Sequence, residues 1–111
     1  DNPHVEQQCL IGLGMTKTIM VAVVSETMRD APSEVIEASV LETVEQLNLV
    51  VERHARVGGV ILTYEPWSIE NGVLTPTLKI KRDQISDRFG EEASAMAVES
   101  AESKTLIIRW R

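Results

Sequence analysis

Two stretches of the chain repeat their apolar residues at the spacing of an α-helix, and segments of β-type composition stand on either side of each. The first repeat advances in steps of four, four, three and four residues, and the second in steps of four, four and three. Such spacing places apolar side chains on one face of an amphipathic helix. The two stripes are Ile36, Val40, Val44, Leu47 and Val51, and Ile85, Phe89, Ala93 and Met96. Each helix must therefore cover another apolar layer.

Segments rich in β-branched and apolar residues supply that layer. They predict strands at residues 5–13, 18–24, 60–64 and 105–110. The short gap between the first two strands indicates a hairpin. The order strand, strand, helix, strand, loop, helix, strand predicts an α+β fold in which two main helices cover a small mixed β-sheet.

Turn-forming residues suggest where these elements begin and end. Ser33, which follows Pro32, is the predicted N-cap of the first helix. The pair Gly58-Gly59 is predicted to end that helix. The pair Asn71-Gly72 predicts a turn in the loop before the second helix.

Length and composition restrict the class of protein. A chain of 111 residues is the size of one domain, and 43% apolar with 25% charged residues is usual for a globular protein. The net charge of −6 disfavours a nucleic-acid partner, because phosphate backbones select basic surfaces. No apolar run approaches the roughly 20 residues of a membrane span. A single cysteine and no visible secretory signal favour the cytoplasm, with membrane association of a parent protein left open.

Cysteine, histidine and glycine residues offer few candidates for chemistry. Cys9 could act as a nucleophile, but neither His4 nor His54 is placed to serve as its base, and cysteine in an apolar strand is usually a core residue. Gly12-Leu13-Gly14 is similar to part of a dinucleotide loop, but the third glycine and the following helix are not there, so a turn is expected. Two histidines and one cysteine form no recognisable metal-ligand spacing, and no metal site is predicted.

Charged residues are the remaining candidates. Four glutamates could in principle form an acid–base pair, but their spacing gives them no common cleft, so a solvated surface is expected. They are Glu65, Glu70, Glu91 and Glu92. A basic cluster of Lys79, Lys81 and Arg82 stands before the second helix, whose N-terminus itself carries partial positive charge. Such a cluster is usually plain surface, but in this position it also suggests contact with a phosphate or carboxylate.

The segment from Tyr64 to Arg82 reads YEPWSIENGVLTPTLKIKR. It closely resembles the last signature of long-chain acyl-CoA synthetases, FTIENG-LTPTLKLKR, in the adenylate-forming superfamily. Upstream, residues 2–7 are similar to the P-VEQ strand of the same family. The helix ending at Leu47-Asn48 and the final strand ending at Trp110 fit the layout of the family. The resemblance therefore covers nearly the whole chain.

The resemblance implies a role in a two-step reaction. A fatty acid first attacks the α-phosphate of ATP to give acyl-AMP and pyrophosphate, and the thiol of CoA then displaces AMP. Lys79 matches the catalytic lysine of the family, which reduces charge repulsion in the first step. Leu78 precedes it, as in the long-chain branch, where other branches have glycine. Arg82 matches a basic residue that is either structural or in contact with phosphate.

The resemblance also implies that residues 1–111 are a single C-terminal domain. The large N-terminal domain, which binds ATP, magnesium and the acyl substrate, and the hinge would precede residue 1. This domain would then be inactive alone and bind no cofactor, while the parent uses ATP, Mg²⁺ and CoA. We expect Lys79 to be exposed, because its partners would lie in the large domain. Leu78 and Ile80 should be more buried.

Two other functions are consistent with the sequence. The first is a different adenylate-forming ligase that shares this domain and makes no thioester. The second is a free-standing α+β module for binding or dimerisation, without chemistry.

Overall fold

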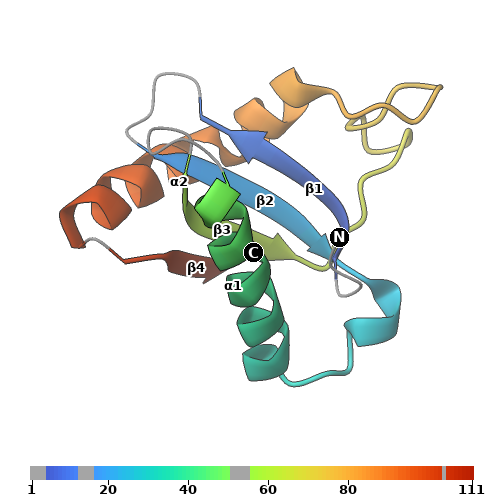
Figure 1. The fold of residues 1–111 in the computed structure, drawn as a ribbon. Helices are drawn as coiled ribbons and strands as arrows, with labels where there is room; N and C mark the ends of the chain where they lie inside the picture. The colour runs from blue at the N-terminus through green and yellow to red at the C-terminus, as the bar shows by residue number, and fades with distance from the viewer. Residues whose placement is uncertain (1–4, 13–16, 51–55, 104) are drawn as a thin grey trace.

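The computed structural model describes residues 5–12, 17–50, 56–103 and 105–111 of the chain (Figure 1). Its elements are β1 (Val5–Ile11), β2 (Thr18–Val24), the short 3₁₀ helix η1 (Glu26–Met28), α1 (Ser33–Val50), β3 (Val57–Thr63), α2 (Arg82–Ser103) and β4 (Ile107–Trp110). This order confirms the predicted α+β fold with two main helices.

The four strands form one mixed sheet in the order β1-β2-β3-β4. β1 runs antiparallel to β2, with Leu10 opposite Met20, as the predicted hairpin requires. β2, β3 and β4 are parallel to one another, and Ile61 pairs with Val21 on one side and Arg109 on the other. Long connections containing α1 and α2 join the parallel strands, because parallel neighbours need a crossover.

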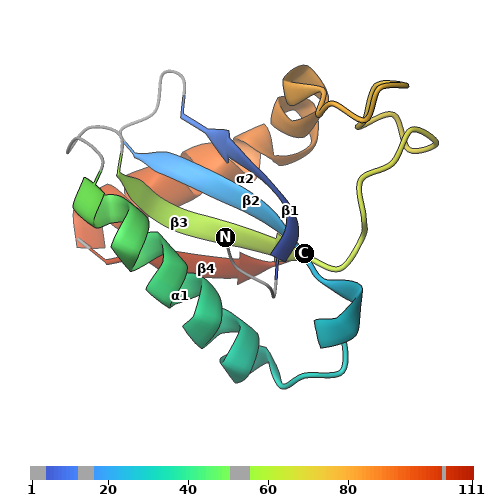
Figure 2. The same cartoon turned by 45° about the vertical axis from the view of Figure 1, so that its right-hand side comes forward.

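The two helices lie on opposite faces of the sheet (Figure 2). Alternate residues of β2 point to opposite sides, which is the period of a strand. Ile19, Val21 and Val23 belong to the core cluster shared with α2, whereas Met20, Ala22 and Val24 belong to the cluster shared with α1. The central strands are therefore buried on both faces and are nearly continuously apolar.

Both predicted helical stripes face this sheet. Ile36, Val40 and Val44 are buried, and Leu47 packs against the same cluster, while Val51 lies outside the described residues. The α2 stripe is buried along its whole length, at Ile85, Phe89, Ala93 and Met96. Among the described residues, no helix is both long and apolar enough to cross a membrane.

The predicted limits of the first helix are less accurate. Ser33 is the first residue of α1 rather than its cap, and the carbonyl of Pro32 accepts hydrogen bonds from the amides of Val35 and Ile36 at 3.0 and 3.4 Å. The prediction that Gly58-Gly59 ends the helix is wrong, because both glycines lie inside β3. The third strand thus begins at Val57 rather than residue 60.

Close packing explains why glycine stands in β3. A Cβ atom on Gly59 would lie 2.9 Å from the carbonyl oxygen of Ile107 and 3.0 Å from the terminal methyl group of Met96. A Cβ on Gly58 would lie 2.7 Å from the hydroxyl of Ser100. The glycines therefore permit the close approach of β4 and α2 to β3.

Gly59→Ala is expected to destabilise the domain by about 1–3 kcal/mol, because the backbone oxygen of Ile107 cannot move without shifting β4. Gly90→Ala is a matched control, because a Cβ on Gly90 in α2 meets nothing within 4 Å. That change should stabilise the domain by about 0.5–1 kcal/mol through helix propensity. Urea denaturation measures both, and equal stability of the Gly59 variant and the unmodified chain would contradict the packing of β3 against β4.

Candidate functional site

The loop between β3 and α2 ends in a tight β-hairpin that carries Lys79. The amide of Thr75 donates to the carbonyl of Lys79, and the amide of Leu78 donates to the carbonyl of Thr75, both at 2.8 Å. The hydroxyl of Thr75 also accepts a hydrogen bond from the Lys79 amide at 3.1 Å. Leu74 and Ile80 pair antiparallel at the base of the hairpin. The backbone of Lys79 is therefore held through both its amide and its carbonyl.

Leu78 has an unusual backbone conformation at the tip of this hairpin. Its φ is 65°, in the left-handed region that favours glycine. A hairpin with a three-residue loop needs one residue in this conformation after its turn. For a leucine, this conformation costs on the order of 1–3 kcal/mol.

The turn also determines which neighbours of Lys79 are buried. The side chain of Leu78 is 67% exposed, so the prediction that it is one of the more buried residues beside Lys79 is wrong. Ile80, in contrast, is half-buried and packs against the core cluster under α2, as predicted. The hairpin is therefore anchored at its base by Ile80, while its tip is open to solvent.

The first part of the loop is fixed to the edge of the sheet. The side-chain amide of Gln7 in β1 donates to the carbonyl of Trp67 at 3.1 Å and accepts from the Trp67 amide at 2.7 Å. Trp67 is only 5% exposed. The predicted turn at Asn71-Gly72 is confirmed, since Gly72 has a φ of 81° and the Asn71 side chain accepts hydrogen bonds from the amides of Ser68 and Val73. The hairpin therefore extends from a firmly packed base.

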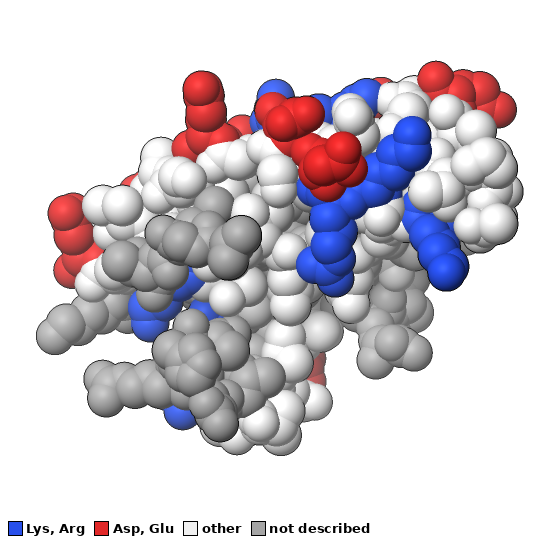
Figure 3. Space-filling model, turned by 90° about the horizontal axis from the view of Figure 1, so that it is seen from above, with Lys and Arg blue, Asp and Glu red and all other residues white. Residues whose placement is uncertain are grey.

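The three residues of the basic cluster are all exposed. α2 begins at Arg82, so Lys79 lies on the loop before the helix, as predicted. Figure 3 shows lysine and arginine side chains gathered over the region of the hairpin and the start of α2, beside acidic ones. Within the described part of the chain, Lys79 forms no ion pair. A cation on a fixed hairpin can thus approach an anion held by another body.

Arg82 is less free than Lys79. Its Nη1 donates to the carbonyl of Leu10, at 3.4 Å, on the open edge of β1. This contact connects the start of α2 to the edge strand. Of the two roles considered for Arg82, structural support or contact with phosphate, it favours the first, and the guanidinium keeps its positive charge.

Beside Arg82 lies a hollow of about 820 Å³ between β1 and α2. Cys9 lines it but is only 5% exposed. Burial raises the pKa of the Cys9 thiol, and the nearby positive charge of Arg82 opposes that rise only in part. The thiol therefore stays protonated near neutral pH and is a poor nucleophile. The structure agrees with the core role, and both candidate bases, His4 and His54, lie outside the described residues.

No family model matches the chain. Relatives from Arabidopsis thaliana match parts of it, among them these three. A peroxisomal long chain acyl-CoA synthetase 7 is 49% identical over 47 residues, which is 42% of this chain and 7% of that protein. A peroxisomal long chain acyl-CoA synthetase 6 is 39% identical over 67 residues, 55% of this chain and 9% of that protein. A chloroplastic long-chain-fatty-acid–[acyl-carrier-protein] ligase is 43% identical over 37 residues, 33% of this chain and 5% of that protein.

Solved structures share the fold across most of the chain. The A-PCP didomain of carboxylic acid reductase from Segniliparus rugosus, in complex with AMP, matches 91% of this chain with a TM-score of 0.67 and 22% identity. The adenylation domain of a carboxylate reductase from Mycobacterium chelonae matches 86% with a TM-score of 0.64 and 20% identity. The matched regions are 15% and 16% of those chains. This chain is similar to the C-terminal domain of an adenylate-forming ligase.

The predicted resemblance is thus confirmed at the level of adenylate-forming ligases. The chain spans at most 9% of the length of the three relatives, so the activity of a whole ligase lies beyond it. In such a domain the hairpin with Lys79 is the candidate functional site, because it presents an exposed cation on a rigid support.

The other candidates from the sequence do not form a site with the hairpin. Glu65, Glu70 and Glu91 are exposed, as predicted. Glu92 is half-buried and pairs with Arg111 at 3.3 Å, so part of the predicted solvated surface is a structural ion pair. No group of described residues could hold a metal ion. Of Gly12-Leu13-Gly14, only Gly12 lies among the described residues, and a strand rather than a helix follows the segment.

Sequence reasoning missed one group of residues in this domain. Arg88 and Arg111 meet beside Phe89, although they are 23 positions apart, because Nη1 of Arg111 donates to the carbonyl of Arg88 at 2.8 Å. No motif or spacing in the sequence connects them. Only the packing of α2 beside the end of β4 brings them together.

Proposed function

We propose that this chain is the C-terminal domain of a long-chain fatty acid–CoA ligase, and that Lys79 is its catalytic residue. The observation that supports this most is the hairpin that holds Lys79 exposed and without an ion pair among the described residues. Two relatives are long chain acyl-CoA synthetases, which supports the same class of substrate.

In the proposed first step, a carboxylate oxygen of the fatty acid attacks the α-phosphorus of ATP. The bond from that phosphorus to the bridging oxygen of pyrophosphate breaks, and acyl-AMP forms. Two anions approach each other in this step, and negative charge increases on the α-phosphate. The ammonium of Lys79 reduces this repulsion and orients the attacking oxygen. Arg82 holds the start of α2 against β1, so it positions the hairpin.

In the proposed second step, the thiol of CoA attacks the acyl carbonyl and AMP leaves. We assign no residue of this chain to CoA. ATP, the fatty acid and Mg²⁺ would be bound mainly by the large domain of the parent, and no described cluster of this chain offers ligands for the metal. The chain alone should therefore be inactive.

The molecule that supplies the acceptor thiol has one specific alternative to CoA. One relative is a long-chain-fatty-acid–[acyl-carrier-protein] ligase, which is named for a carrier protein instead of CoA. Both alternatives share the first step and the role of Lys79. They differ only in the second step.

A domain exchange tests the proposal. This chain replaces the matching C-terminal segment of Arabidopsis long chain acyl-CoA synthetase 7, and pyrophosphate release is measured with ATP and a long-chain fatty acid. We expect the fusion to form acyl-AMP, and the isolated chain to release no pyrophosphate. Supplying CoA or acyl-carrier protein then identifies the acceptor. A folded fusion without adenylation, beside an active unmodified synthetase, would refute the proposal.

A further inference from the structure

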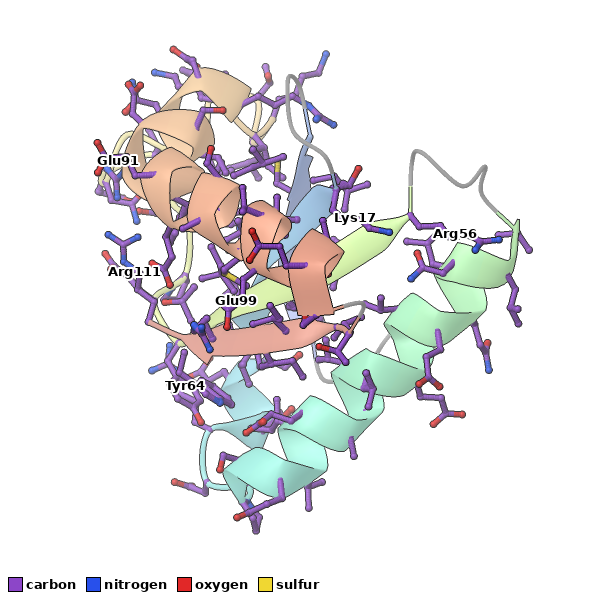
Figure 4. The ribbon with its side chains drawn as sticks, turned by 90° about the vertical axis from the view of Figure 1, so that its left-hand side faces the viewer. Lys17, Arg56, Tyr64, Glu91, Glu99 and Arg111 are labelled. Carbon is purple, nitrogen blue, oxygen red and sulfur yellow. The ribbon has the colours of Figure 1, made fainter. Side chains whose placement is uncertain are left out.

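A second hollow, separate from the hairpin, lies where β3 and β4 end. It has a volume of about 350 Å³ and is lined by Thr63, Tyr64, Glu65, Arg88, Phe89 and Arg111. Figure 4 shows Tyr64 and Arg111 at one end of the sheet and Lys17 and Arg56 at the opposite end. Ligands of open α/β sheets usually bind outside the carboxyl ends of parallel strands, which is where this hollow lies.

Arg111 is held in place by three contacts. Its Nη1 donates to the carbonyl of Arg88 at 2.8 Å and lies 3.3 Å from a carboxylate oxygen of Glu92. Its guanidinium also lies over the ring of Phe89, 4.9 Å from the ring centre. A guanidinium fixed in this way loses little further freedom when it binds a ligand. Its Nη2 and Nε atoms have no hydrogen-bond partner among the described residues.

Arg88 brings a second guanidinium to the same hollow. Its Nη2 donates a hydrogen bond to the carbonyl of Asn71, in the loop before the hairpin. This bond fixes one end of the guanidinium. Within the described residues, Arg88 forms no ion pair, although Glu65 lines the same hollow. Arg88 therefore has a defined position and no carboxylate within ion-pair distance among the described residues.

Tyr64 also lines the hollow, and its side chain packs against the core cluster under α1. The ring of Tyr64 stacks on that of Trp110 with 5.2 Å between ring centres. The carbonyl of Tyr64 accepts a hydrogen bond from Nη2 of Arg29 at 2.8 Å. Phe89, at the floor, is only 7% exposed. The hollow is thus lined by residues with defined contacts, and one of its two arginines lies over the ring of Phe89.

We propose that this hollow binds a small oxyanion of the phosphate class between Arg88 and Arg111. A guanidinium presents parallel N–H donors whose spacing matches two oxygens of a phosphate, and two such groups can contact one tetrahedral anion. The proposal uses neither Lys79 nor Arg82. It stands whether or not the chain belongs to a fatty acid–CoA ligase.

Nuclear magnetic resonance titration of the chain with inorganic phosphate, at constant ionic strength, tests the proposal. The amide signals of residues 63–65, 88, 89 and 111 should move together and give one dissociation constant. Arg88→Gln and Arg111→Gln should each raise that constant by about 10-fold or more, since a charge-assisted hydrogen bond is lost. Arg109→Gln is the matched control, because Arg109 is also exposed but pairs with Glu99 at 2.7 Å. The dissociation constant of this variant for phosphate should equal that of the unmodified chain.

Three results would overturn the proposal. They are shifts scattered over the whole surface, an equal effect of the Arg109 variant, and acetate binding at least as tightly as phosphate. Arg88→Lys keeps the positive charge but removes the planar guanidinium and its paired N–H donors. This variant replaces Arg88→Gln in the titration if Arg88→Gln does not fold. It should weaken phosphate binding while leaving the signals of α2 otherwise in place.

Discussion

Lys79→Ala, in the fusion with the large domain of the Arabidopsis synthetase, is expected to lower the rate of acyl-AMP formation by about 10²–10³-fold. Loss of one preorganised charge beside a reacting oxyanion typically has an effect of about this size. The thioester-forming step should suffer much less when acyl-AMP is supplied ready-made, because the proposed charge repulsion belongs to the first step. Pyrophosphate exchange measures the first step, and acyl-CoA formation from synthetic acyl-AMP measures the second.

Lys81→Ala is the control for this experiment, since Lys81 is exposed in the same loop and carries the same charge. It should change adenylation only slightly. In the isolated chain, Lys79→Ala should alter stability by no more than about 0.5 kcal/mol, as expected for an exposed side chain. Equal losses in both half-reactions would indicate a folding or docking role, and unimpaired adenylation would remove Lys79 from the mechanism.

The layers of the fold could be predicted because each depends on a local period. The stripe from Ile36 to Val44 and the stripe from Ile85 to Met96 repeat at the helical period, and both proved to be buried against the sheet. The strand β2 is a run of apolar and β-branched residues, as expected for a strand buried on both faces. Periodicity does not, however, predict that the two helices take opposite faces, because that depends on how the strands are connected.

Glycine and turn residues were harder to interpret, because one residue type serves several purposes. Gly58-Gly59 has the composition of a helix stop, but its purpose is the close approach of Ile107 and Met96, which lie more than 35 positions further along the chain. Leu78 has the composition of a core residue, but a turn formed with Thr75 points it into solvent. In both cases the deciding partner is fixed by tertiary contacts that a local pattern does not contain.

The functional residues could likewise be predicted only in part. Lys79 was found through the family resemblance of its segment, since a cluster of three basic residues alone is usually plain surface. The hairpin explains physically why that segment presents the lysine. The arginine pair at the end of β4 has no signal in the sequence, because it forms only when the register of β4 brings Arg111 next to α2.

Phe89→Ala is expected to destabilise the isolated chain by about 3–5 kcal/mol, the usual range for removing a buried phenylalanine. The side chain is 7% exposed and belongs to the core cluster between α2 and the sheet. The change also removes the ring under the Arg111 guanidinium. A domain whose free energy of unfolding is in the ordinary range, about 5–15 kcal/mol, would lose much of it.

Val98→Ala is the matched control for this prediction, because Val98 lies on the same helix but is 52% exposed. Its effect should stay within about 0.5 kcal/mol. Thermal and urea denaturation of the two variants and the unmodified chain measure the difference. A melting temperature of the Phe89 variant equal to that of the unmodified chain would show that α2 does not pack on the sheet through this side chain. Phe89→Ala also alters the hollow that Arg88 and Arg111 line, because Phe89 lines it too and lies under the Arg111 guanidinium.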